Sequence, residues 1–565
     1  MVLSAATSSA QQGISLPRFT PPLDIPIQLA GNFMELRSDH FHSGLDMKTL
    51  GREGLPVKTA GAGWVSRIKI SPWGYGKAVY IDHPNGYTTV YGHLSKLEGN
   101  VGEAALAAQY KARSYDVDVT FSKGEVPVTD GQVIARSGNT GGSSAPHLHF
   151  EVRRTSDQHA LDPEAYGMDV NDSVPPIISG LRIDPMDSLS RNSPYPERAK
   201  GFAVVAKNDT TYALKEGLLP AAFGTVGLSV NVIDRYSDRE NTCGIRQLAV
   251  SVDGEAVFSA TLDEIDFGVQ RYADAYMDYR LFKEDDMHYN RCYKLPNNKL
   301  TLYGREPVRG RITVTPGRDH AVQVVATDAN GNRSTLTFVL RGATAAEAAA
   351  WEGPKAIGDL FRYDQENTLV RDGLRFTLPP NALYDNTWIR YAKGGAARNA
   401  WAPVHKLHDG STPLQLAGEL ALDVPKPPAG ALTGKLLIVK LDDKGRPSAV
   451  GGTYANGRIT TKVRSFGTYT VMLDTLPPTL TVLDMKPSMK GRSGFRIRVG
   501  DDLSGLDEWS ATLDGEWILL EYEPKSHLLK HTFDVHSNKP GTHTLVIEAR
   551  DERGNRTTVT RTFVR

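Results

Sequence analysis

Apolar and polar residues alternate along short stretches through most of this chain, which is the pattern of half-buried β-strands. Residues 321–326 and 543–549 are clear examples. Asp-Gly and Asn-Gly pairs, which favour hairpin turns, separate many of these stretches. Residues 101–112 and 343–350 instead collect alanine and other strong helix formers, so we expect a short helix in each. The pattern predicts a mainly β protein with few helices.

The C-terminal part of the chain repeats an earlier part. The string DSVPP from Asp172 recurs as DTLPP from Asp474, and DANGNRST from Asp328 recurs as DERGNRTT from Asp551. Short strands and turns in a unit of about 90 residues are typical of a β-sandwich, and both copies resemble bacterial immunoglobulin-like (Ig-like) modules. The first copy is longer because of an insertion at residues 267–303.

The segment between the two copies is also predicted to form a β-sandwich. Strand-like runs at 374–378 and 435–440 are punctuated by turn pairs. His405 and His408 lie three apart in this segment, without carboxylate or cysteine company, and we interpret them as surface-loop residues.

Composition is that of an ordinary folded protein of several domains. The 565 residues are 40% apolar and 23% charged, which excludes the disordered, collagenous and coiled-coil classes. Lys plus Arg number 65, as do Asp plus Glu, so the net charge is 0 and we expect no nucleic-acid partner. A run of about 18 apolar residues is absent from the sequence, so we expect no membrane span.

Two features bear on the compartment. The first residues, MVLSAATSSAQQ, have the small residues of an export-signal cleavage region but lack a basic start and a full apolar stretch; the alternative is a tail of a cytoplasmic protein. Cys243 and Cys292 permit a disulfide without requiring one, and two buried thiols would look the same.

Candidate chemistry is concentrated before residue 155. His42 and Asp46 form an H-x-G-x-D string, in which Gly44 and the polar neighbours disfavour a helix. A bend there would let the imidazole and the carboxylate converge on one cation, and both are good zinc ligands. Such a spacing also arises by chance, so the string alone is a weak signal.

Two further strings carry histidines. In HLHFE, His147 and His149 are two apart on a predicted strand and so share one face, while Leu148 and Phe150 pack beneath. One imidazole could bind a metal while the other faces a metal-bound water; alternatively both lie on an exposed strand face. In YGHL, His93 stands at the exit of a strand that follows the Asn85-Gly86 turn.

Together these strings resemble the lysostaphin-type, or LytM-like, zinc metallopeptidases, which are peptidoglycan endopeptidases. The set HxGxD, YGHL, SGNTG and HLHFE stands in the order of that family within residues 30–155, and each metal and catalytic position is filled. The resemblance implies that zinc is held by His42, Asp46 and His149, with the fourth position open for water.

The resemblance also implies roles for the other two histidines. Zinc lowers the pKa of its bound water toward about 7, and this zinc-bound water is the implied nucleophile. The family has no H-E-x-x-H glutamate, so His147 takes the proton of the attacking water, while His93 orients that water and helps to stabilise the tetrahedral intermediate. Which of the two donates to the leaving amine stays open.

Other polar residues near these strings have plainer interpretations. We interpret His40 as a supporting or structural residue and His83 as a hairpin residue. Arg37 either holds Asp46 or the substrate, or lies on a solvated edge. The helix expected at 101–112 falls between two of the strings, and we expect it at the wall of the substrate groove.

The predicted fold class is mainly β: an antiparallel β-sheet metallopeptidase domain followed by three β-sandwich (Ig-like) modules. The expected division is a tail at 1–20, the metallopeptidase domain at 21–165, and sandwiches at 172–342, 343–473 and 474–565.

Two functions follow from this organisation. The first is a zinc-dependent endopeptidase that cuts peptidoglycan stem peptides in the cell envelope, as a periplasmic or secreted protein. A direct cross-link is favoured as its target because the sequence holds nothing like the wall-targeting domain of glycine-bridge cutters. The alternative is a catalytically silent envelope scaffold or activator that binds protein or glycan partners through its sandwiches.

Overall fold

The computed structural model describes residues 16–193, 201–236, 241–304, 307–351 and 356–565. The string interpreted as a cleavage region lies outside these residues. Strands far outnumber helices in the described chain, which confirms the mainly β prediction. The two predicted helices are confirmed as α1 (Gly99–Ala112) and α4 (Ala345–Ala348). None of the described helices has the length and apolar character needed to cross a membrane.

The N-terminal domain is built on one antiparallel sheet in the order β1-β2-β11-β6-β5-β4-β8, with β9 and β12 at its margins. Its strands are β1 (Leu29–Gly31), β2 (Leu45–Lys48), β4 (Gly63–Ile70), β5 (Lys77–Asp82), β6 (Tyr87–Leu94), β8 (Val117–Thr120), β9 (Pro127–Val128), β11 (His147–Arg154) and β12 (Ala160–Leu161), followed by the 3₁₀ turn Pro163–Tyr166. A second sheet consists of β3 (Pro56–Lys58), β10 (Val133–Arg136) and β7 (Lys96–Leu97). Helix α1 packs against β10, β7 and β8.

The first sandwich follows and is joined to the N-terminal domain by more than the chain. Its strands are β13 (Ile177–Pro185), β14 (Arg191–Ser193), β15 (Phe202–Ala206), β16 (Thr211–Leu214), β17 (Ala221–Ile233), β18 (Gln247–Val252), β19 (Glu255–Thr261), β20 (Glu264–Ile265), β21 (Tyr289–Arg291), β22 (Ile312–Val314), β23 (Asp319–Thr327) and β24 (Arg333–Gly342). Its insertion holds a 3₁₀ turn (Gln270–Tyr272), α2 (Ala273–Tyr276) and α3 (Tyr279–Asp285). Strand β20 pairs with β12, and the two domains share one buried apolar cluster.

The central sandwich has its own apolar core between two five-stranded sheets. Its strands are β25 (Asp359–Phe361), β26 (Asn367–Arg371), β27 (Leu374–Leu378), β28 (Thr387–Ile389), β29 (Tyr391–Ala396), β30 (Pro403–Leu407), β31 (Pro413–Asp423), β32 (Leu436–Leu441), β33 (Pro447–Gly451), β34 (Thr453–Ala455), β35 (Arg458–Ser465) and β36 (Gly467–Leu473), with a 3₁₀ turn at Gly430–Lys435. The surface-loop interpretation of His405 and His408 is wrong. Both are buried. His405 is on β30, which lies between β29 and β36, and contacts Tyr391. His408 directly follows β30 and contacts Phe466.

The C-terminal sandwich stacks two four-stranded sheets, β37-β38-β42-β41 and β40-β39-β43-β44. Its strands are β37 (Thr479–Val482), β38 (Gly494–Gly500), β39 (Leu506–Leu513), β40 (Glu516–Trp517), β41 (Glu521–Glu523), β42 (Leu528–Thr532), β43 (Thr542–Asp551) and β44 (Arg556–Val564). We keep the predicted division of the chain as a proposal, with the names N-terminal domain and first, central and C-terminal sandwich for its parts.

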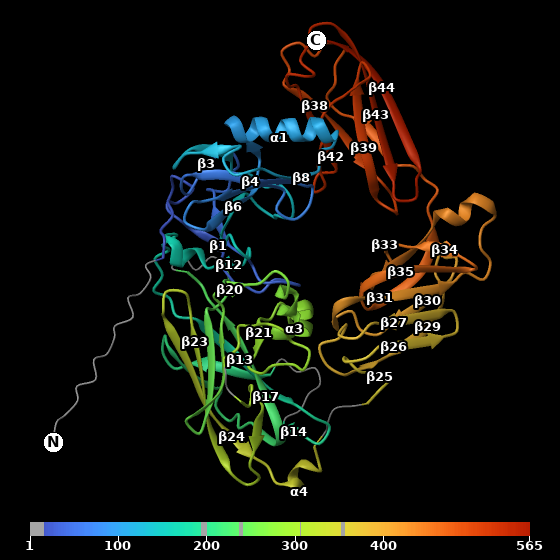
Figure 1. Cartoon of the computed structure of the whole chain (residues 1–565). Coiled ribbons are helices and arrows are strands. Elements are labelled where there is room, and N and C mark those ends of the chain that lie inside the picture. Colours follow the sequence, from blue (N-terminus) through green and yellow to red (C-terminus); the bar gives the residue numbers. More distant parts are fainter. Residues whose placement is uncertain (1–15, 194–200, 237–240, 305–306, 352–355) are drawn as a thin grey trace, which may run out of the picture.

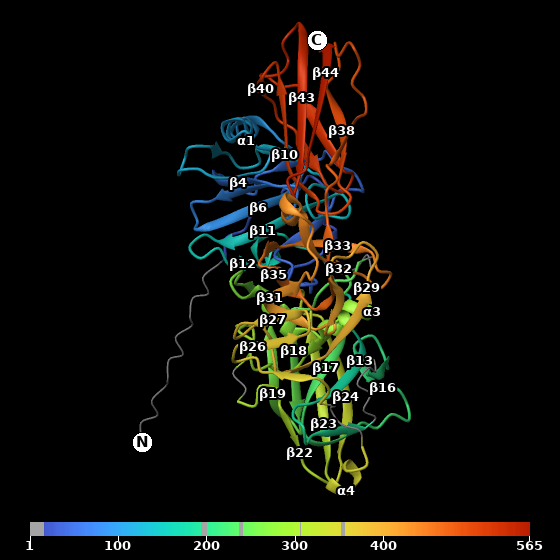
Figure 2. The same ribbon diagram turned by 90° about the vertical axis from the view of Figure 1, so that its right-hand side faces the viewer.

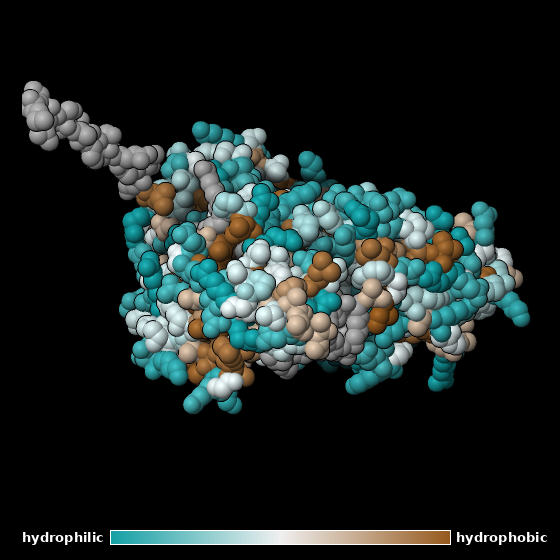
Figure 3. Space-filling model, turned by 90° about the horizontal axis from the view of Figure 1, so that it is seen from below, coloured by the Kyte–Doolittle hydropathy of each residue, from teal (hydrophilic) through white to brown (hydrophobic). Residues whose placement is uncertain are grey.

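The four parts form a closed ring, in which the C-terminal sandwich returns to the N-terminal domain beside α1 (Figures 1 and 2). The ring closes through the Lys77–Glu521 ion pair, whose charged atoms are 2.7 Å apart, and through a hydrogen bond from Tyr110 to Asp534 of 2.6 Å. On the face seen in Figure 3, apolar side chains lie in small separate groups among hydrophilic ones. Cys243 and Cys292 are buried and are not bonded to each other.

Candidate metal centre

Two neighbouring strands bring the three predicted ligands together. Asp46 on β2 stands directly opposite His149 on β11, and His42 lies in the bend that leads into β2. The bend packs against β11 so closely that a Cβ at Gly44 would lie 2.2 Å from the Phe150 carbonyl oxygen. The glycine of the H-x-G-x-D string is therefore required by this close approach.

The donor atoms of these three residues converge. His42 Nε2 lies 3.0 Å from Asp46 Oδ1 and 3.0 Å from His149 Nδ1, and the last two atoms are 2.9 Å apart. His42 Nδ1 donates to the Asn32 carbonyl (2.7 Å), and His149 Nε2 donates to the Glu151 carboxylate (2.8 Å). Each imidazole thus keeps its other nitrogen for the shared space.

This arrangement fits a metal ion. Two ligands of a tetrahedral zinc ion, each 2.0–2.1 Å from it, are about 3.3 Å apart, so the donors need to move only slightly. Nitrogen and carboxylate donors suit zinc. All three residues are buried, at 6%, 7% and 2% exposure, which shields a bound ion from bulk water on the protein side.

Without a metal, the pKa values of the three ligands favour a protonated, positively charged His149 beside an ionised Asp46. Burial lowers the pKa of His42. Burial also opposes charge on His149, but hydrogen bonds to Asp46 and Glu151 outweigh it and raise the pKa of His149 to about 9. Burial opposes ionisation of Asp46 too, yet the surrounding imidazoles hold its pKa well below the usual range. Metal binding would therefore displace a proton from His149.

His147 faces the same space from β11. Leu148 and Phe150 are fully buried on the opposite face of the strand, as the alternation predicted. His147 Nδ1 donates to the Ala145 carbonyl (2.9 Å), so in the neutral form of the ring Nε2 is the acceptor nitrogen. That Nε2 is buried and lies 3.2 Å from Asp46 Oδ1.

His93 completes the group from the end of β6. Its ring centre is 4.7 Å from that of His147, and its Nδ1 donates to the Thr140 carbonyl at 2.8 Å. His93 has a left-handed φ of 58°, and Thr140 precedes Gly141, where φ is 74° and a Cβ would lie 2.3 Å from Gly74 O. Burial and the neighbouring histidines lower the pKa of His93 to about 3, so it is neutral at pH 7.

Comparison with known proteins agrees with this geometry. Residues 40–116 and 107–163 match the model of peptidase family M23. The N-terminal domain belongs to peptidase family M23. Residues 358–474, in the central sandwich, match a Zu5-like domain.

Relatives with assigned names match about a fifth of the chain. The DD-carboxypeptidase/endopeptidase Mpg of Neisseria meningitidis is 34% identical over 118 residues, which is 21% of this chain and 21% of that protein. The peptidoglycan DD-endopeptidase ShyA of Vibrio cholerae is 36% identical over 99 residues, which is 18% of this chain and 17% of that protein. The chain thus matches about a fifth of the length of these relatives.

Among solved structures, the catalytic domain of lysostaphin from Staphylococcus simulans shares 26% identity, with 24% of this chain and 89% of that chain covered and a TM-score of 0.18. A zinc-containing peptidase from Vibrio cholerae shares 27% identity, with 28% and 41% covered and a TM-score of 0.19.

The M23 domain contains a buried network that the motifs did not reveal. The fully buried Glu151 carboxylate accepts hydrogen bonds from His149 (2.8 Å), Ser43 (2.6 Å), Tyr75 (2.5 Å) and Arg153 (2.5 Å). The Tyr75 ring also stacks on His149, with ring centres 4.9 Å apart. The network orients the His149 ring and fixes which nitrogen faces the metal centre. Strand alternation could have revealed Glu151 and Arg153, since both share the face of His149.

The other residues singled out in the sequence lie around the centre or elsewhere in the domain and are not among the converging donors. Arg37 donates to Asp46 Oδ2 at 3.1 Å, so it holds this carboxylate and does not lie on a purely solvated edge. His40 bonds to Asp39, and His83 flanks the hairpin turn between β5 and β6. Helix α1 packs on three strands and carries Tyr110 to the C-terminal sandwich. Its place at the wall of the substrate groove stays a prediction.

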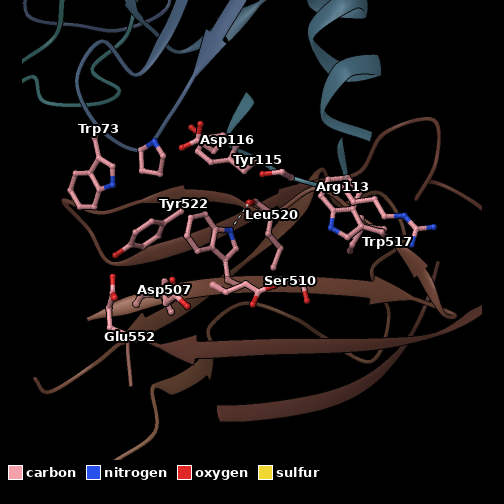
Figure 4. A pocket seen from close by; sticks show the side chains of 16 residues that line it. Trp73, Arg113, Tyr115, Asp116, Asp507, Ser510, Trp517, Leu520, Tyr522 and Glu552 are labelled. Atoms are coloured by element: carbon pink, nitrogen blue, oxygen red, sulfur yellow. Dashed lines mark hydrogen bonds between the residues drawn. The ribbon is translucent and has the colours of Figure 1, made fainter. Parts of the chain in front are cut away.

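The C-terminal sandwich reaches the loop beside His147. Lys525 Nζ donates to the carbonyl oxygens of Asn139 and Ser143, the latter at 3.0 Å, and Ser143 Oγ lies 3.2 Å from His147 Nδ1. A cavity of about 580 Å³ lies between the two domains. In Figure 4, Trp73 and Asp116 of the M23 domain line it opposite Tyr522 and Glu552 of the sandwich. The metal centre and the sandwich are thus connected through one short loop.

Proposed function

We propose that this protein is a zinc-dependent endopeptidase that hydrolyses peptide bonds of peptidoglycan. The observation that carries the proposal is the convergence of His42, Asp46 and His149, whose donor atoms lie within 4.8 Å of one another, with His147 and His93 facing the same space. Three protein ligands leave one position for water or substrate, which is the arrangement of catalytic zinc sites.

Different residues would bind the metal and accept protons. His42, Asp46 and His149 would hold the ion, which when bound supplies a Lewis acid and lowers the pKa of water. His147 would accept a proton at Nε2, since the Ala145 carbonyl keeps the other proton on Nδ1.

We propose a narrower role for His93 than the family resemblance implied. The Thr140 carbonyl holds its proton on Nδ1, so the neutral ring presents an acceptor at Nε2. It is therefore suited to orient an attacking water. To stabilise a negatively charged intermediate it would need a second proton, which its lowered pKa opposes.

The relatives guide the choice of bond and compartment. Mpg and ShyA are named as DD-carboxypeptidase/endopeptidase and DD-endopeptidase, so we propose the D,D cross-link between stem peptides as the target. This substrate lies outside the cytoplasm, and we place the protein in the cell envelope accordingly. The sandwiches would then present the M23 domain to the wall.

Digestion of purified peptidoglycan tests the proposal. Wild-type protein, protein stripped of zinc and reloaded, and a His147→Ala variant are incubated with sacculi, and new amine ends are identified by mass spectrometry. We expect cross-linked muropeptides to be converted to monomers by the wild-type and reloaded protein alone. Near-stoichiometric zinc without cleavage in any preparation would overturn the proposal in favour of the envelope scaffold.

A further inference from the structure

The two Ig-like sandwiches carry the same buried acidic group at the same end of the fold. In each, one aspartate precedes the first strand, one follows the strand that pairs with it, and one closes the strand before the final hairpin turn. One oxygen from each residue lies within 4.8 Å of the others, and the groups are Asp172, Asp234, Asp328 and Asp474, Asp501, Asp551. The sequence repeat had matched two of the three positions; the structure adds the third.

Burial makes these groups costly without a cation. Asp234 and Asp328 are 1% exposed, and Asp551 is 0% exposed. Oδ1 of Asp234 is buried and has no hydrogen-bond partner among the residues described. A buried carboxylate oxygen without a partner loses its hydration without compensation. Burial and the carboxylates of Asp328 and Asp172 raise the pKa of Asp234 to about 8, so the three groups repel one another strongly.

In the C-terminal group, backbone N–H groups donate to all three carboxylates. Within the described chain none of its three aspartates pairs with a Lys or Arg. Burial, and then Asp474 and Asp551, raise the pKa of Asp501. Beside the group, Ser504 Oγ is also buried without a hydrogen-bond partner among the described residues, and the backbone N–H of Ser504 donates to Asp474.

Each group has an asparagine that makes the same two hydrogen bonds. Asn332 Nδ2 donates to Asp328 Oδ2 (2.8 Å) and to the Asp172 carbonyl (3.3 Å). Asn555 Nδ2 donates to Asp551 Oδ2 (2.7 Å) and to the Asp474 carbonyl (3.3 Å). The aspartates are thus held in place before any ion arrives.

We propose that each Ig-like sandwich binds one Ca²⁺ ion between its three aspartates. The donors are all oxygen, which suits a hard cation, and the groups lack the imidazoles that make the M23 centre a zinc site. Asp172 follows the M23 domain and Asp474 follows the central sandwich, so each ion ties an incoming linker to the end of a sandwich. The proposed role is to stiffen two of the junctions in the ring.

Metal stoichiometry tests the proposal directly. Full-length protein is stripped with EGTA, titrated with Ca²⁺ by calorimetry, and analysed for bound metal by mass spectrometry. We expect two Ca²⁺ ions per chain, one in Asp328→Asn, one in Asp551→Asn and none in the double variant. Because EGTA also binds zinc, zinc is restored before the titration, and its content should be equal in all of these proteins. Asp507→Asn, on the C-terminal sandwich but outside the group, is the matched control and should keep both ions.

Measurements on the wild-type protein test the proposal even if a variant fails to fold. Ca²⁺ should raise the melting temperature of the wild-type protein, and an equal concentration of Mg²⁺ should not replace it. Failure of stripped, folded wild-type protein to take up Ca²⁺ at millimolar concentration would overturn the proposal. Ca²⁺ binding is measured without peptidoglycan, so this test can fail or succeed whether or not the proposed function is correct.

Discussion

The Glu151→Gln substitution asks whether the buried network sets the affinity of the metal centre. The substitution keeps the size of the side chain but removes the negative charge of the carboxylate. That carboxylate accepts a hydrogen bond from His149 Nε2 at 2.8 Å. Carboxylates that orient a ligating histidine are worth about 10–100-fold in metal affinity. We therefore expect zinc to bind about 10–100 times more weakly, which corresponds to about 1.4–2.7 kcal/mol.

The same substitution removes one partner of a buried ion pair. Glu151 and Arg153 are 0% and 7% exposed, and loss of such a partner costs up to about 3–5 kcal/mol of stability. Arg153 retains its contacts with the Tyr80 and Phe267 rings, which limits the loss. Zinc affinity must therefore be measured below the melting temperature of the variant, by competition with a chromophoric chelator.

Two companion variants make the measurement decisive. Tyr75→Phe removes one donor to Glu151 and leaves its charge, so its zinc affinity should fall by less than about tenfold. Glu264→Gln removes a carboxylate that also pairs with arginine but lies far along the surface from the centre, and its affinity should equal that of the wild type. If folded Glu151→Gln bound zinc as tightly as the wild type, the assigned role of the network would be refuted.

Three other predictions concern catalysis, ring closure and pH. His147→Ala should keep zinc and lose cleavage, whereas Asp46→Asn should lose zinc as well; metal analysis and the sacculus assay separate the two. Glu521→Lys should repel Lys77 and open the ring, which would raise the radius of gyration in X-ray scattering, while Glu548→Lys on an exposed strand should leave it unchanged. Burial, and then Asp162, raise the pKa of Glu164 from 4.5 to about 8, so this group favours folding at low pH and loses that contribution as the pH rises from 4.5 to 8. Glu164→Gln should therefore raise the melting temperature more at pH 8 than at pH 5, and an equal effect at both would contradict the assignment.

Local pattern predicted much of the fold and most of the candidate centre. Alternation placed His147 and His149 on one face, and the Asn85-Gly86 pair predicted the hairpin that leads to His93. These features depend on residues close in sequence, where backbone geometry leaves few choices. The roles assigned to the five residues remain proposals.

Contacts between distant residues could not be predicted in this way. The burial of His405 and His408 depends on Phe466 and on β36, which pairs with β30 although it lies about sixty residues downstream. The Lys77–Glu521 pair joins residues 444 positions apart, and nothing local to either residue indicates the other. Asp234 and Asp501 both lie in the pattern V-x-D-x-x-S, but so short a pattern is not distinctive without the fold.

The closed ring changes how the M23 domain is attached to the rest of the protein. Because both ends of the contact belong to one molecule, the C-terminal sandwich meets its docking face at a local concentration in the millimolar range, whatever the amount of protein in the cell. A contact too weak to hold two separate proteins together can therefore persist here. When the contact breaks, the M23 domain is still joined to the C-terminal sandwich through the rest of the chain, so the contact can form again within the same molecule.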